Sequence, residues 1–200
     1  EGGTEYGHAA TMARSKNIEG PYELSPIHPF ISSREKEDYY LQKSGHADLV
    51  QTQDGKWLAV FLTARPTTSR GLCILGRETS IETVDWPKNE WPVLGSGNSL
   101  PRVEVPINAG ATKDFYELTT KDDFNTQELN INFQSLRIPI TEEWASLKNR
   151  PGFLTLVGRD SLSSKYQQSL LARRIDSLNM ETSTCLDFFP ETFQQMAGLV

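Results

Sequence analysis

The chain has 200 residues, of which 37% are hydrophobic and 23% are charged, a composition typical of a folded protein with one large core or two smaller ones. Its formal net charge is -6 and its longest basic run is Arg173-Arg174, which argues against a nucleic-acid partner because phosphate binding needs clustered lysine and arginine. The sequence has no run of about 18 apolar residues, so it predicts no membrane span.

The beginning of the chain, EGGTEYGH, lacks the basic and apolar regions of a signal peptide and is typical of the interior of a protein. The two cysteines, Cys73 and Cys185, lie far apart and predict neither a disulfide framework nor a metal site. The compartment, whether cytoplasmic, periplasmic or secreted, therefore stays open.

Residues 7–15 (GHAATMARS) are expected to form a strand, because Gly2-Gly3 and Gly20-Pro21 leave too little room for a stable helix. Residues 31–43 are polar without regular alternation and predict a loop or a short helical turn. They lead into a segment with much clearer periodicity.

Residues 44–61 (SGHADLVQTQDGKWLAVF) predict a β-hairpin. Apolar residues alternate over 47–51 and crowd 57–61, and Asp54-Gly55 supplies the positive φ that a tight turn needs. Gly45 allows another part of the chain to approach the backbone closely, and His46 is expected at a strand start, where loops build sites.

Residues 72–84 are strand-like again, with an interruption at Gly76-Arg77-Glu78, and the aromatic-proline segments 85–87 and 90–92 are expected to close this part as turns. Four short strands within about 80 residues favour an all-β fold of antiparallel blades or a barrel over α/β layers.

The composition changes at residues 95–110, which are rich in Gly, Ser, Asn and Pro and predict a domain boundary. Beyond them the spacing of strands suggests a β-sandwich with one helical turn at 144–148. The expected strands are 129–133, 153–158, 169–173 and 187–189. A sandwich with so few strands would keep an unpaired edge and an uncovered face, so the second domain is expected to be truncated.

Several motifs occur in an order and spacing that resemble the family 43 glycoside hydrolases, in the branch of β-xylosidases and α-L-arabinofuranosidases. In the first half they are EGGT (1–4), HAATMARS (8–15), GPYE (20–23), GHADL (45–49) and LGRET (75–79). In the second half FQSLR (133–137), RPG (150–152), GRDSL (158–162) and FQQMAGL (193–199) resemble the concanavalin-like sandwich that this branch carries after its catalytic domain.

This resemblance implies that residues 1–107 are the C-terminal blades of a five-bladed β-propeller and that residues 108–200 begin the β-sandwich. It also implies an inverting, exo-acting enzyme that releases xylose or arabinose from xylo-oligosaccharides or arabinosides. No obligatory cofactor is implied, and a calcium ion at the propeller centre stays open.

The resemblance also assigns roles to three residues. Glu1 falls on the general acid, Arg77 on an arginine that binds sugar hydroxyls, and His46 on a histidine at the channel centre that contacts calcium or water. An inverting acid and base stand about 6.5–9.5 Å apart, and the acid needs a raised pKa to keep its proton. His8, Glu5 and Asp48 are candidates for supporting roles only.

Each assignment has a simpler alternative. Glu1 beside two glycines is also typical of a solvated loop, and His46 of a hydrogen-bonded structural histidine. Arg77 next to Glu78 is compatible with a surface ion pair.

The family's two catalytic aspartates lie upstream of the motifs present here, so the chain is expected to be an internal segment of a longer enzyme and to be inactive alone. Its partners would be the substrate and the rest of its own propeller and sandwich, and association of identical subunits stays open. The alternative is a non-catalytic carbohydrate-binding or structural β protein.

Overall fold

The computed structural model describes residue 2, residues 5–107 and residues 121–200. Within these residues the chain consists of strands, turns and bends without a helix, which confirms the predicted all-β class. None of the described segments forms a helix long and apolar enough to cross a bilayer. The chain divides into two compact units, Glu1–Thr112 and Lys113–Val200, here called the N-terminal and the C-terminal unit.

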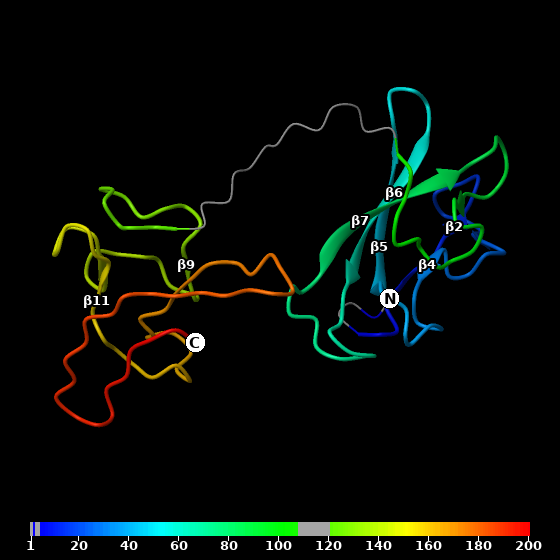
Figure 1. Cartoon of the computed structure of the whole chain (residues 1–200). Helices are drawn as coiled ribbons and strands as arrows, with labels where there is room; N and C mark the ends of the chain where they lie inside the picture. The colour runs from blue at the N-terminus through cyan, green and yellow to red at the C-terminus, as the bar shows by residue number, and fades with distance from the viewer. Residues whose placement is uncertain (1, 3–4, 108–120) are drawn as a thin grey trace. The chain divides into compact units, whose positions relative to one another are not determined.

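A four-stranded antiparallel sheet dominates the N-terminal unit (Figure 1). Its order is β5-β6-β7-β8, with β5 at Gln42–Gln51, β6 at Trp57–Ala64, β7 at Glu78–Asp85 and β8 at Val93–Leu94. The β5–β6 hairpin confirms the prediction, and its turn contains Gly55 at φ 84°. Side-chain bonds from Thr52 to Asp54 and to the carbonyl of Lys56 fix this turn.

Short strand pairs lie beside this sheet. The first pair is β1 (Ala9–Ala10) with β4 (Ile31–Ser32), and the second is β2 (Ala13–Arg14) with β3 (Glu23–Leu24). The single strand expected over residues 7–15 is therefore two short strands with different partners. Residues 33–41 form the predicted turns, but both ends of the loop predicted over 31–43 are strand, because residues 31–32 belong to β4 and residues 42–43 to β5.

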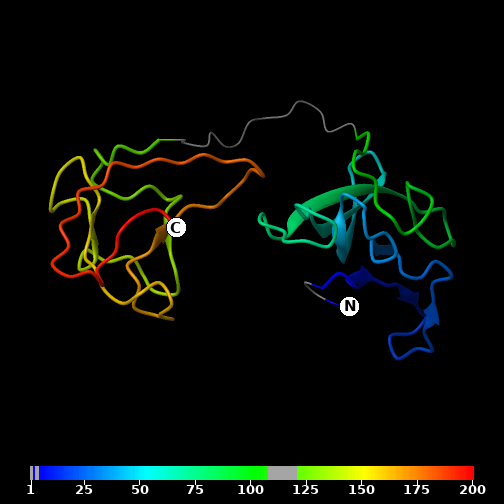
Figure 2. The ribbon, with the colours of Figure 1, turned by 60° about the horizontal axis from the view of Figure 1, so that its bottom comes forward.

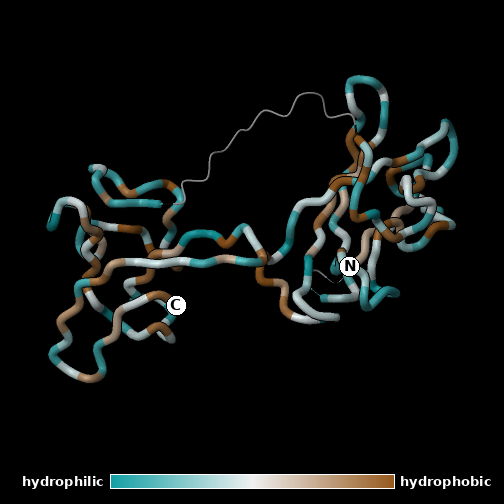
Figure 3. The backbone as a smooth tube through the Cα atoms, in the orientation of Figure 1, coloured by the Kyte–Doolittle hydropathy of each residue, from teal (hydrophilic) through white to brown (hydrophobic). Residues whose placement is uncertain are grey.

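The core of the N-terminal unit lies where β4 packs on the four-stranded sheet. Its buried members are Phe30, Ile31, Ala59, Phe61, Val84 and Leu94, and Ala10, Met12, Ala47, Leu49 and Trp57 pack around them. Figure 3 shows hydrophobic residues along these strands and hydrophilic residues in the loop that joins β5 to β6. Because the core anchors β1, β4 and β5 together, the ends of these strands are held in fixed positions.

The strand predicted over 72–84 is shorter in the structure, because β7 begins only at Glu78. A hydrogen bond from the Gly76 amide to the Cys73 carbonyl (2.9 Å) closes a turn, and Gly76 itself has φ 72°. Arg77 is thus an exposed bend residue within the predicted interruption, immediately before β7. After β7, a hydrogen bond from the Glu90 amide to the Pro87 carbonyl (3.1 Å) closes the predicted turn.

A buried ion pair connects β7 to the segment after β8. The Glu82 side chain has no exposed surface, and its carboxylate accepts bonds from the Arg102 guanidinium (2.5 Å), the Arg102 amide (2.9 Å) and the Thr83 amide (2.8 Å). Burial raises the pKa of Glu82, but the bonds from Arg102 and Thr83 outweigh it and leave the pKa below its usual range. Glu82 is therefore charged at neutral pH.

The C-terminal unit consists mainly of loops with two-residue strands (Figure 2). They pair as β9 (Gln134–Ser135) with β12 (Leu171–Ala172), and β10 (Ala145–Ser146) with β11 (Thr155–Leu156). Strands β11 and β12 lie within the predicted strands 153–158 and 169–173. The indole of Trp144, which is 3% exposed, donates to the Pro139 carbonyl (3.1 Å) at the centre of this unit.

Three predictions for the C-terminal unit are wrong. Residues 129–133 form a turn. The side-chain oxygen of Asn130 accepts a hydrogen bond from the Asn132 amide, and the main-chain carbonyl of Asn130 accepts one from the Phe133 amide. Residues 187–189 are exposed and form no strand. The helical turn expected at 144–148 begins earlier, at Thr141, and Ala145–Ser146 is already strand β10.

Large apolar side chains are exposed in the last part of the C-terminal unit, where every residue from 181 to 200 is exposed. The most exposed include Phe189 (88%), Phe193 (95%) and Met196 (79%). A folded protein seldom leaves so many large apolar groups in water, so this surface calls for a covering partner.

Replacing Arg102 by alanine is expected to lower the free energy of unfolding by about 3 kcal/mol, because the buried carboxylate of Glu82 would keep its backbone donors but lose its counter-charge. Urea denaturation of the intact protein, followed by tryptophan fluorescence, measures the change. Arg34→Ala is the control: Arg34 pairs with the largely exposed Glu35 and its loss should cost about 0–1 kcal/mol.

The same comparison has a defined pH dependence. Because folding lowers the pKa of Glu82, its contribution is present above the unfolded pKa and is lost as the pH falls through the folded value. The difference between wild type and Arg102→Ala should therefore shrink in acid, and an equal difference at every pH would contradict the buried pair.

Candidate functional site

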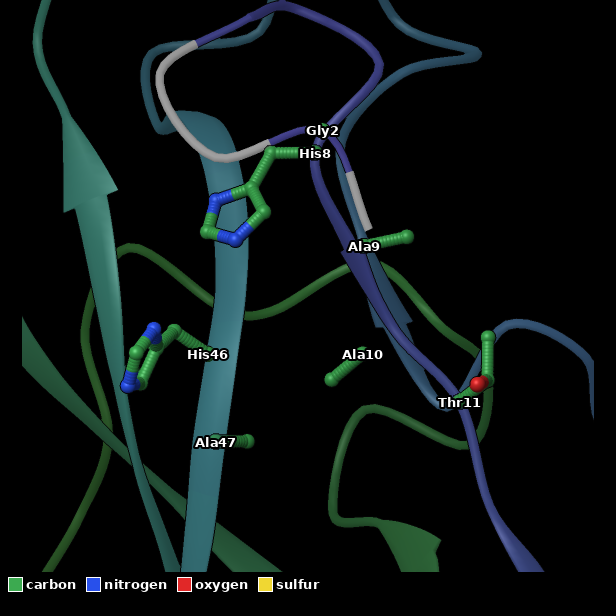
Figure 4. A pocket seen from close by; sticks show the side chains of 7 residues that line it. All are labelled: Gly2, His8, Ala9, Ala10, Thr11, His46 and Ala47. Atoms are coloured by element: carbon green, nitrogen blue, oxygen red, sulfur yellow. The ribbon is translucent and has the colours of Figure 1, made fainter.

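A hollow of about 500 Å³ lies between the start of the chain, β1 and β5. Figure 4 shows the His8 imidazole over β5 and the His46 imidazole at the left edge of the strand, while the methyl groups of Ala10 and Ala47 point toward one another at its right. The residues that line the hollow are Gly2, His8, Ala9, Ala10, Thr11, His46 and Ala47. The site therefore combines two titratable side chains with small residues that leave space.

Strand β5 is irregular where it borders the hollow. Its pairing with β6 is regular from Asp48 to Gln51 but shifts between Gln42 and Gly45 and again between Gly45 and Asp48. Lys43 and His46 both have φ 55°, in the left-handed region that non-glycine residues seldom adopt. Two bulges thus follow one another, and bulges commonly redirect side chains beside sites. His46 lies in mid-strand, not at the strand start as predicted.

His8 is the buried side chain of the site, with 3% exposure. Its Nδ1 lies 2.8 Å from the Lys43 carbonyl, which can only accept, so Nδ1 carries the proton and Nε2 is left unprotonated. The imidazole lies directly on Gly45: a Cβ there would be 2.8 Å from Cδ2 and Nε2 of the ring. The predicted close approach at Gly45 is confirmed, and its partner is His8.

The pKa of His8 depends on its burial and on the groups around it. Burial lowers the pKa of His8, the hydrogen bond to the Lys43 carbonyl opposes this, and the positive charge of Arg77 lowers it further, with a contribution from His46. His8 is therefore a neutral imidazole at pH 7. The charge of Arg77, which precedes β7, therefore acts on His8.

Arg77 is exposed and does not line the hollow. The ion pair with Glu78 that the sequence allowed does not form, because Glu78 holds the guanidinium of Arg65 through two bonds of 2.7 and 2.8 Å. Among the described residues Arg77 has no ion-pair or hydrogen-bond partner, so its five donors stay free for a ligand.

The remaining candidates are less informative. Glu1 lies outside the described residues, and its neighbour Gly2 lines the hollow. Glu5 and Asp48 are exposed, and neither carboxylate bonds to another described residue. No group of three metal-binding side chains occurs in the part of the chain that the structure describes. Calcium prefers six to eight oxygen ligands, so His46 and its described neighbours do not fit this ion.

Sequence reasoning underestimated His8, which it treated as a supporting residue. A glycine inside a strand does signal a close backbone approach, and Gly45 was recognised in this way. The residue that approaches it lies 37 positions earlier in the chain, and no local pattern connects the two.

Comparison with known sequences gives a consistent result for both halves of the chain. Residues 1–92 match the sequence family described as glycosyl hydrolases family 43, and residues 121–200 match the beta xylosidase C-terminal concanavalin A-like domain. A beta-xylosidase of Bacillus subtilis is 46% identical over the whole chain, and a non-reducing end alpha-L-arabinofuranosidase of Bacteroides ovatus is 35% identical. The chain spans 39% and 37% of the lengths of these two relatives.

The structure is similar to that of a xylan beta-1,4-xylosidase from Bacillus halodurans, with a TM-score of 0.81 and 44% identity. The likeness covers 88% of this chain and 34% of the other. Together with the sequence matches it confirms the predicted fold, propeller blades followed by the start of a concanavalin-like sandwich.

Replacing Gly45 by alanine is expected to destabilise the protein by about 1–3 kcal/mol, because the new methyl group would collide with the buried His8 ring. Urea denaturation of the intact protein measures the loss. Gly7→Ala is the matched control: a Cβ at residue 7 meets nothing within 4 Å, and its effect should stay within about 0.5 kcal/mol. Equal effects of the two substitutions would contradict the contact.

Proposed function

The chain belongs to glycosyl hydrolases family 43, and from this membership we propose that the whole protein is an inverting, exo-acting glycosidase that releases xylose or arabinose from small oligosaccharides. The observation that carries the proposal is the match of the entire chain to β-xylosidases and arabinofuranosidases. The hollow lined by His8, Thr11 and His46 supports it, since these polar side chains can form hydrogen bonds with the hydroxyls of a terminal sugar.

In this proposal Arg77 and His46 bind the sugar. The planar guanidinium of Arg77 can donate two parallel hydrogen bonds to neighbouring hydroxyls, and its freedom from an internal ion pair leaves it available. His46 borders the hollow with a side chain exposed to solvent. Both residues would orient the substrate, a role that needs no cofactor.

The proton transfers need carboxyl groups. Inversion requires an acid that protonates the leaving oxygen and a base that activates water on the opposite face of the sugar. We propose Glu1 as the acid, on the basis of the sequence resemblance and of the position of Gly2 at the hollow. The base and the orienting aspartate would come from the rest of the protein, because the relatives are more than twice as long as this chain.

The rest of the protein would also complete the fold. The exposed apolar side chains of residues 181–200 suit a surface that the remaining strands of the sandwich cover. This proposal treats the rest of the same protein as the main partner of the chain, and it makes the isolated 200 residues inactive.

Arg77→Ala in the full-length protein is expected to lower kcat/KM for p-nitrophenyl β-D-xyloside or α-L-arabinofuranoside about 10- to 100-fold, since a hydrogen bond from a charged donor contributes about 1.5–3 kcal/mol. Arg34, which is half-buried, pairs with Glu35 and does not line the hollow, provides the control, because Arg34→Ala removes an equal charge. Loss of activity in both variants to the same degree would argue for a general charge effect.

Glu1→Gln is expected to lower kcat about 10²- to 10⁴-fold on xylobiose, the range of general acid catalysis, and much less on the p-nitrophenyl glycoside, whose leaving group needs little protonation. Steady-state kinetics on both substrates separates the two effects. The control is Glu5→Gln, which neutralises a nearby exposed carboxyl group. Unchanged turnover of xylobiose by Glu1→Gln would place the acid elsewhere in the protein.

A further inference from the structure

Two bulges in β5 place Lys43 and His46 in the left-handed region, both at φ 55°. Such a conformation is strained for a non-glycine residue and persists only where the surroundings hold it. The contacts that hold this segment are therefore part of what places His46 beside the hollow.

His8 contacts the segment between the two bulges. Its Nδ1–H donates to the Lys43 carbonyl at 2.8 Å, at the first bulge, and its ring lies on Gly45, next to the second. His8 is itself anchored, because its own carbonyl accepts a bond of 2.9 Å from the buried hydroxyl of Ser32 in β4. His8 thus connects β4 to the irregular part of β5, through its carbonyl on one side and its imidazole on the other.

Neighbouring contacts hold the strand from other sides. The buried hydroxyls of Ser33 and Ser44 lie 2.5 Å apart, and the Gln42 side chain donates to the carbonyls of Lys36 (2.6 Å) and Tyr39 (2.8 Å). These contacts reach residues 42 and 44, before the second bulge. The contact of the His8 ring with Gly45 is the one nearest to His46.

We propose that His8 is a positioning residue: by holding Lys43 and Gly45 it keeps the His46 imidazole on the side of β5 where a sugar binds in the hollow. The sugar-binding part of this inference rests on the proposed function. A purely structural His8 would stabilise the unit without acting through His46, and the two roles lead to different measurements.

The first test compares His8→Asn with His8→Phe in the full-length protein. The side-chain amide nitrogen of asparagine can take the place of Nδ1 and donate to the Lys43 carbonyl, whereas phenylalanine keeps a ring on Gly45 but has no donor. His8→Phe should lower kcat/KM on the aryl xyloside by about tenfold to 100-fold, the range expected for a displaced binding group. His8→Asn should stay within about twofold of wild type.

A double-mutant cycle with His46→Ala separates positioning from stability. If His8 acts through His46, His8→Phe should lower kcat/KM strongly in the wild-type protein. In the His46→Ala variant the same substitution should lower kcat/KM by less than about twofold. Full additivity of the two losses, or a His8→Asn variant as impaired as His8→Phe, would overturn the proposal.

The second test needs no turnover and remains available if the protein is not a glycosidase or if His8→Phe fails to fold. Long-range ¹H–¹⁵N spectra of the histidines should show His8 as the neutral Nδ1–H form near pH 7, and the His46 ring signals should be the same in wild type and His8→Asn. An Nε2–H form of His8, or His46 signals displaced in His8→Asn, would refute the inference. Absence of hydrolysis by wild type with these spectra intact would refute only the glycosidase.

Discussion

The hydrogen bond from His8 to the Lys43 carbonyl lies where the regular pairing of β5 with β6 gives way to two bulges. From Asp48 to Gln51 the hairpin pairs regularly, and Leu49 packs against the core. Before Asp48 the pairing of β5 is irregular, Gly45 leaves room for the His8 imidazole, and His46 borders the hollow. One sheet thus contributes to the core at one end and borders the hollow at the other, and rigid sheets commonly present functional groups in this way.

The distribution of charge in the N-terminal unit fits this division. Glu82 is ionised and fully enclosed, and its function is to hold the chain together. Around the hollow His8 is neutral, and among the described residues no carboxylate contacts His8 and none forms an ion pair with Arg77. Side chains that supply hydrogen-bond donors suit a neutral, hydroxyl-rich ligand.

The sequence predicted the elements that local patterns encode. The β5–β6 hairpin follows from alternation and an Asp-Gly turn, and the glycine contact follows from Gly45 inside a strand. Prediction failed where distant residues or side-chain bonds decide the backbone. The bulges at Lys43 and His46 lie in contact with His8, a residue distant in the chain, and the turn that replaces the strand at 129–133 contains a hydrogen bond to the side chain of Asn130. A tertiary contact or an Asx turn leaves little trace in hydrophobic periodicity.

The attachment of Arg102 to Glu82 has a further consequence for how this architecture can vary. Because β8 pairs with β7 through Val93 and Leu94, and the amide and guanidinium of Arg102 are fixed on Glu82, the chain beyond residue 92 is held on the sheet at two points. Lengthening a surface loop costs little free energy once its ends are tethered. The aromatic-proline connection at 86–92 is thus a place where insertions of different length can accumulate among homologous proteins without disturbing the sheet.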